Sequence, residues 1–69
     1  MQNKNELAND GFLTVAAAVN FSALGRSTLY GLMETGVLPY AKIGTARRIP
    51  KRALVEFMAN KTISREAGN

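Results

Sequence analysis

The chain has 69 residues, enough for one small domain, and it carries a net charge of +4. It contains no cysteine and no histidine, which excludes disulfides, thiolate zinc sites and an imidazole base. The five carboxylates are scattered along the chain without a close pair: Glu6, Asp10, Glu34, Glu56 and Glu66. We therefore expect no enzyme, no metal and no other cofactor.

The first eleven residues are polar and are expected to form a flexible N-terminal segment. No apolar run reaches the roughly 18 residues of a membrane span, and no apolar region typical of a signal peptide follows the N-terminus. With no cysteine either, the expected location is the cytoplasm.

A first helix is predicted over residues 15–21, ending near Phe21–Ser22, with the Thr14 hydroxyl as its N-cap. The alanine-rich sequence favours a helix, and Val15, Ala18 and Val19 form its apolar stripe. Residues 23–25 are expected to make a tight turn with Leu24 pointing inward.

A second helix is predicted from Gly25, Arg26 or Ser27 to about residue 34, and Gly36 suits the left-handed position that follows a helix. Its core-facing residues are expected to be Leu29, Leu32 and Met33. Gly31 lies inside this helix, where glycine costs about 0.5–1 kcal/mol relative to alanine.

A β-hairpin follows, with strands over residues 40–43 and 47–49 around a turn at 44–46. Ile43 and Ile49 are its expected apolar anchors. Pro50 fits the start of a third helix over residues 51–61, or the position just before it. The buried stripe of that helix would be Leu54, Phe57 and Met58, and residues 62–69 would be a flexible tail.

The positive charge is concentrated in one window. Residues 42–52 hold five of the nine basic residues and no acid: Lys42, Arg47, Arg48, Lys51 and Arg52. Such a cluster favours a polyanionic partner, although a solvated loop would explain it equally well.

The order of elements predicts a mostly α fold with a small β-hairpin, a winged helix-turn-helix domain over residues 12–61. In this fold the second helix enters the major groove of DNA and the hairpin contacts the phosphates or the minor groove. The candidate DNA-binding residues are Arg26, Ser27, Thr28, Tyr30, Lys42, Thr45, Arg47, Arg48, Lys51 and Arg52.

Each candidate has a structural alternative. Ser27 and Thr28 could only cap their helix, and Tyr30 could lie at the edge of the core. Because side chains alternate along a strand, Arg47 and Arg48 should point to opposite faces. We favour Arg47 for the minor groove and Arg48 for a phosphate.

The chain resembles the excisionase-family, MerR-like winged helix-turn-helix domains over residues 12–58. The blocks that carry the resemblance, in unbroken order, are Phe12-Leu13-Thr14-Val15-Ala16-Ala17-Ala18, Arg26-Ser27-Thr28-Leu29-Tyr30, Glu34-Thr35-Gly36-Val37-Leu38-Pro39, Lys42-Ile43-Gly44, Arg48-Ile49-Pro50, and Leu54 with Phe57. No single block is specific, but the ordered set is.

The resemblance implies a small excisionase, or recombination directionality factor, of a mobile element. Double-stranded DNA would be one partner, in association with the nucleoid, and an integrase another. Because the predicted elements include no long dimerisation helix of the kind that full MerR regulators carry, we expect a monomer in free solution that binds DNA cooperatively. The chain differs from the usual motif of the family in three places: Ala17 stands where the family commonly has a glutamate, the turn lacks a serine before Arg26, and Gly31 stands where the family has a basic residue.

Two other functions stay open at this point. A transcriptional regulator of the same fold would carry the same residues. A protein-interaction module would dock an acidic partner through the basic hairpin, because a fold does not fix a function.

Overall fold

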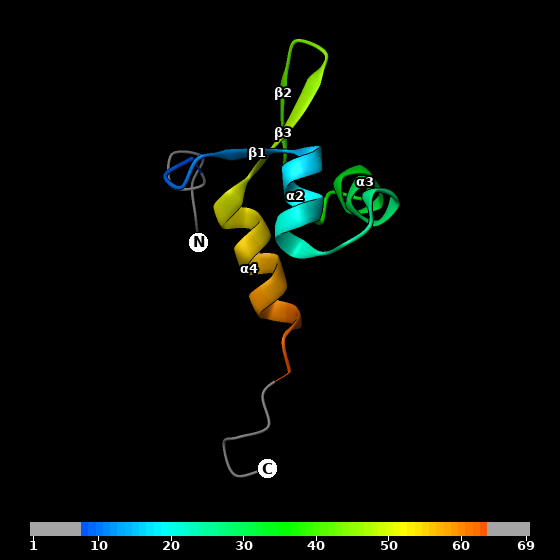
Figure 1. The fold of residues 1–69 in the computed structure, drawn as a ribbon, viewed down its shortest axis with the longest axis vertical. Coiled ribbons are helices and arrows are strands. Elements are labelled where there is room, and N and C mark those ends of the chain that lie inside the picture. The colour runs from blue at the N-terminus through cyan, green and yellow to red at the C-terminus, as the bar shows by residue number, and fades with distance from the viewer. Residues whose placement is uncertain (1–7, 64–69) are drawn as a thin grey trace.

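The computed structural model describes residues 8–63 and confirms the winged helix-turn-helix architecture (Figure 1). The elements in chain order are β1 (Phe12–Thr14), α2 (Val15–Ser22), α3 (Arg26–Glu34), β2 (Ala41–Ile43), β3 (Ala46–Pro50) and α4 (Lys51–Lys61). Within residues 8–63, no helix is long and apolar enough to cross a membrane.

The helix-turn-helix is formed by α2 and α3, as predicted. The Thr14 hydroxyl accepts a hydrogen bond from the amide of Ala17 at 3.0 Å and so caps α2. Ala23 then adopts a left-handed conformation with φ of 61°, which ends the helix. The Ser22 hydroxyl donates to the carbonyl of Ala18 and accepts from the amide of Leu24, so the turn is fixed on both sides.

Gly25 occupies the N-cap of α3 and supplies no side-chain hydrogen bond there. The cap that the sequence lacks is therefore absent from the structure too, and α3 begins with exposed residues. At the other end, Gly36 has a φ of +82°, a conformation that glycine adopts without strain. The prediction for the end of this helix is confirmed.

A third strand, β1, was missed by the sequence analysis, which predicted no strand before the first helix. The sheet has the order β1-β3-β2 and is antiparallel throughout. β1 pairs with β3, and Leu13 lies opposite Ile49. A strand of three residues has too little alternation to be recognised, and its partner lies far away in the sequence.

The prediction that Ile43 anchors the hairpin is wrong. Ile49 is fully buried, but Ile43 is 62% exposed. The register explains the difference: Ile43 pairs with Ala46 next to the turn, where the hairpin projects beyond the helices (Figure 1). No other element covers the hairpin at that level, so an apolar side chain there stays in solvent.

The predicted flexible segment at residues 1–11 lies mostly outside the described residues. The part in view forms a turn at residues 8–10, attached to the start of α4. The amide of Lys51 donates to the carbonyl of Gly11, and Arg52 pairs with Asp10 at 3.2 Å. The predicted tail falls mostly on residues 64–69, which lie outside the described range. The domain boundaries at residues 11 and 61 stay predictions.

The core lies between α2, α3, β3 and α4. The buried hydrophobic residues are Val15, Ala18, Leu29, Met33, Leu38, Ile49, Ala53 and Leu54. Leu24, Leu32, Phe57 and Met58 pack against this cluster but keep some exposure, which largely confirms the predicted apolar stripes. Leu38 is 1% exposed and was not predicted, because it lies in a connecting segment without periodicity.

Candidate nucleic-acid interface

The first turn of α3 presents an open, polar surface. Arg26, Ser27 and Thr28 are all exposed, and this turn contains no acidic residue. Because Gly25 provides no side-chain cap, the first amides of α3 are not satisfied by a cap hydrogen bond. A free helix N-terminus beside an arginine and two hydroxyls suits an anion such as a phosphate.

The second part of the candidate interface is the hairpin of β2 and β3, called the wing below. Its two-residue turn, Gly44 and Thr45, sets the register, so that Lys42 lies opposite Arg47 and Ala41 lies opposite Arg48. Paired residues share a face of the sheet. Lys42 and Arg47 therefore lie on one face of the wing and Arg48 on the other, as alternation predicted.

The wing and α3 are joined by Arg47. Its Nη2 lies 2.8 Å from Oε2 of Glu34, near the end of α3. Its guanidinium carbon lies 5.0 Å from the ring centroid of Tyr30 and 4.6 Å from that of Tyr40. These contacts confirm that the second helix of the helix-turn-helix and the basic hairpin lie side by side.

The environment of Arg47 favours its charged form. The hydrogen bond that Glu34 accepts raises the pKa of Arg47 above the ordinary value of an arginine, and the nearby tyrosines act in the same direction. The Arg47 side chain is 24% exposed, and its Nη1 is buried without a hydrogen-bond partner. The structure thus places Arg47 against α3 and not at the tip of the hairpin.

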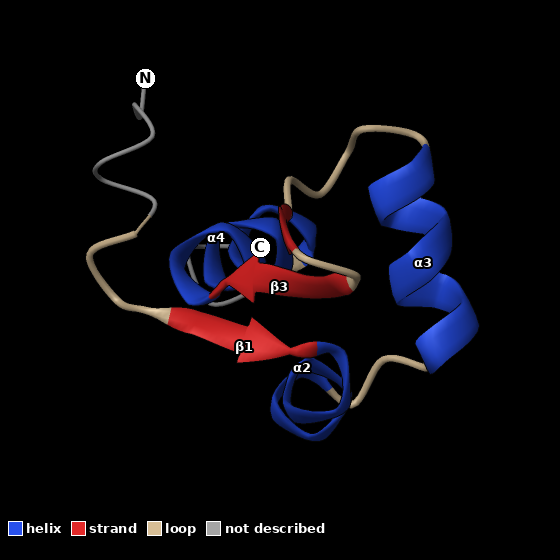
Figure 2. Ribbon diagram, turned by 90° about the horizontal axis from the view of Figure 1, so that it is seen from above, coloured by secondary structure: helices blue, strands red, loops and turns tan. Residues whose placement is uncertain are grey.

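The remaining basic candidates differ in accessibility. Lys42 is exposed, while Arg48 is half-buried and donates to the carbonyl of Arg47. Lys51 lies over the ring of Phe21, 5.1 Å from its centroid. Viewed from above, α3 and α4 lie on opposite sides of β3 (Figure 2). Lys51, which starts α4, is therefore not brought next to the first turn of α3.

Two residues of this region were missed by the sequence analysis as partners of the wing, Glu34 and Tyr40. The signal was present in part. Tyr30 and Glu34 are four residues apart and share a helix face, and Tyr40 precedes Lys42 by two residues, which puts both on one strand face. The sequence did not show that this face of α3 and this face of the wing lie close enough for their side chains to contact each other.

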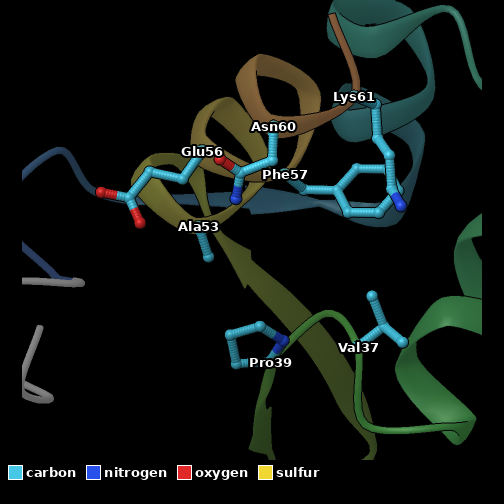
Figure 3. Close-up of a pocket in the computed structure, with 7 residues that line it drawn as sticks. All are labelled: Val37, Pro39, Ala53, Glu56, Phe57, Asn60 and Lys61. Carbon is cyan, nitrogen blue, oxygen red and sulfur yellow. The ribbon is translucent and has the colours of Figure 1, made fainter. Parts of the chain in front are cut away.

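A hollow of about 320 Å³ lies elsewhere, between α4 and the segment that follows α3 (Figure 3). Its lining residues are Val37, Pro39, Ala53, Glu56, Phe57, Asn60 and Lys61. Glu56 is the one acidic residue among the seven that line the hollow and are drawn in Figure 3. Within residues 8–63, no group of three acidic side chains could hold a metal ion. The DNA-binding candidates lie outside this hollow.

Comparison with known proteins agrees with this geometry. The family model described as a helix-turn-helix domain matches residues 12–62, which include all three helices and the wing. The chain belongs to the excisionase-like helix-turn-helix family.

One curated relative of this helix-turn-helix domain is a protein of Saccharopolyspora erythraea named "Probable excisionase". The two are 38% identical over 53 residues, which cover 77% of this chain and 54% of the relative. The chain therefore spans about half the length of the curated relative it matches. No solved structure matches the chain significantly. The family resemblance seen in the sequence is confirmed.

Proposed function

We propose that the protein is a small excisionase of a mobile element that binds double-stranded DNA with sequence preference. The observation that carries the proposal is the placement of the wing beside α3, through the ion pair of Arg47 and Glu34. This arrangement lets one duplex meet both elements at once. The name of the curated relative favours excision over transcriptional regulation.

In this proposal α3 enters the major groove with its first turn. Arg26 reads a guanine edge or binds a phosphate, and the hydroxyls of Ser27 and Thr28 contact bases or backbone. Lys42 and Arg48 lie on opposite faces of the wing, so they can reach phosphates of the two strands that border a minor groove. Thr45 at the wing tip enters that groove, while Lys51 and Arg52 make a separate phosphate contact.

The DNA-binding part of the proposal is tested by a mobility-shift titration over a series of salt concentrations. Affinity is expected to fall steeply with salt, with a logarithmic slope of about 0.9 for each phosphate neutralised. Arg26→Ala should weaken binding, whereas Lys61→Ala at the far end of α4 removes the same charge and should have a much smaller effect. Absence of salt-dependent duplex binding at micromolar protein would refute the proposal.

The excision part is tested with an integrase encoded beside the protein and a substrate that carries its attachment sites. Addition of the protein should increase excision and leave integration unchanged or reduced. A protein that represses a reporter gene but leaves excision unaffected would be a regulator instead. We further propose a monomer in free solution, which sedimentation without DNA tests directly.

A further inference from the structure

Four side chains meet where the wing passes α3: Arg47 of β3, Glu34 and Tyr30 of α3, and Tyr40 just before β2. We call this group the clamp. We propose that the clamp fixes the position of the wing relative to α3, and that Arg47 is a positioning residue for DNA binding and not a DNA contact. The inference rests on the proposed DNA-binding function and assigns a role within it.

The clamp links the wing to α3 through side chains. The hairpin is held to the body of the protein at its base, where β3 pairs with β1 through residues 48–50. The two residue pairs nearest the turn lie beyond that ladder. Among residues 8–63, the bond from Arg47 to Glu34 is the one side-chain hydrogen bond between the wing and α3. This bond therefore adds a direct side-chain link between the wing and α3 to the link through residues 35–40, where the Leu38 amide donates to the carbonyl of Leu32.

The geometry also argues against a DNA contact by Arg47. Its Nη2 is engaged by Glu34, and its Nη1 is buried beside two tyrosine rings. A phosphate could reach this guanidinium only if the ion pair opened and the rings moved aside. Lys42, on the same face of the wing, is exposed and needs no such rearrangement.

The clamp has a second consequence for the interface. Glu34 is a carboxylate on the helix proposed to enter the major groove, and its side chain is 63% exposed. An unpaired carboxylate there would repel the DNA backbone. Pairing with Arg47 compensates the negative charge of Glu34. The same contact therefore positions the wing and reduces the repulsion between Glu34 and the DNA phosphates.

The decisive variant is Glu34→Ala, because two models predict opposite signs. Removal of a negative charge should tighten DNA binding if electrostatics alone mattered. If the clamp positions the wing, the variant should instead weaken binding about two- to fivefold, the factor that corresponds to a surface ion pair. Glu56→Ala on α4 makes the same change of charge and is expected to leave binding unchanged or slightly tighter. An affinity gain for Glu34→Ala equal to or above that of Glu56→Ala would overturn the proposal.

The salt dependence separates a positioning residue from a phosphate contact. Arg47→Ala should lower the affinity but keep the slope of log affinity against log salt, whereas Lys42→Ala should reduce that slope by about 0.9. Arg47→Lys serves if the alanine variant does not fold. It keeps the charge but loses the planar fork and the ring stacking, and it should weaken binding as Glu34→Ala does. A reduced slope for Arg47→Ala, or wild-type binding by Arg47→Lys, would contradict the clamp.

The last readout needs no DNA. The chain has two tyrosines and no tryptophan, and both tyrosines belong to the clamp. The near-ultraviolet circular dichroism of tyrosine therefore reports on the clamp alone. Glu34→Ala and Arg47→Lys should reduce this signal while the far-ultraviolet spectrum persists, and Glu56→Ala should preserve it. An unchanged tyrosine signal in both clamp variants would overturn the proposal, whereas an absence of DNA binding by wild type would refute only the proposed function.

Discussion

Thr14 occupies a position where a single hydroxyl decides how a helix starts. It satisfies one of the free amides of α2 by accepting from Ala17 at 3.0 Å. Thr14→Ala should therefore lower the free energy of unfolding by about 1 kcal/mol, measured by urea denaturation. Ser27→Ala is the matched control, because Ser27 is exposed and forms no cap bond, and it should change stability by less than about 0.5 kcal/mol.

Gly31 stands where the family resemblance in the sequence led us to expect a basic residue. It lies in α3, it is exposed, and a Cβ built there would meet nothing within 4 Å. Gly31→Ala should therefore raise the free energy of unfolding by about 0.5–1 kcal/mol, measured by urea denaturation, because alanine loses less backbone entropy on helix formation. A destabilised Gly31→Ala would show that the helix is more crowded than the structure indicates.

The same site tests the orientation of α3 on DNA. Gly31→Arg adds a cation next to Tyr30, on the helix face proposed to meet the duplex. It should tighten duplex binding and increase the salt slope by about 0.9, while Gly31→Ala should leave the slope unchanged. Mobility-shift titrations of both variants measure this, and equal slopes for the two would place Gly31 away from the phosphates.

At the scale of the elements, the hairpin shows why identical residue types can differ in importance. Ile43 and Ile49 lie on adjacent strands, yet one is 62% exposed and the other is fully buried. Ile49→Val should cost about 0.5–1.5 kcal/mol of stability, because it removes a buried methylene from a closely packed core. Ile43→Val makes the same chemical change at the wing tip and should be neutral within about 0.5 kcal/mol. Thermal melts of the two variants give the comparison, and equal losses would mean that the wing tip is covered in solution.

Some elements could be predicted from the sequence and others could not, depending on whether the segment itself carries a recognisable pattern of residues. α4 was predicted with its observed bounds, since Pro50 marks its start and the apolar stripe of Leu54, Phe57 and Met58 has helical spacing. The turn between α2 and α3 was also recognised. β1 was not, because it exists only through its pairing with β3, and a three-residue segment carries no periodicity of its own.

For the molecule as a whole, the small core limits what can be changed. A domain of this size has a net stability of only a few kcal/mol. Leu54→Ala should cost about 2–5 kcal/mol, because Leu54 is fully buried, and should leave much of the protein unfolded at room temperature. Val55→Ala in the same helix removes a side chain that is 41% exposed and should be far milder. Circular dichroism at room temperature distinguishes the two, and a fully folded Leu54→Ala would show that stability comes from elsewhere.

The whole molecule also rearranges the charge that the sequence groups together. The five basic residues of the window 42–52 are adjacent in the chain but are used differently in space. Lys42 is free at the surface, Arg47 pairs with Glu34, and Arg52 pairs with Asp10. Two of the five cations therefore form ion pairs within the protein, while Arg48 donates to a backbone carbonyl and Lys51 lies over the ring of Phe21. The sequence overstated the continuous basic surface because it showed the cations without their partners.

The sequence alone determined the helices, the turn between the first two, the wing and the family, because these depend on spacing and residue type within short segments. It also determined that Arg47 and Arg48 face opposite sides, since alternation along a strand is local. Only the tertiary structure decided which of them meets α3, that Glu34 and Tyr40 receive it, and that a third strand closes the sheet. Each of these depends on segments that are distant in the chain, whose separation is set by packing of the common core and leaves no mark on the local pattern.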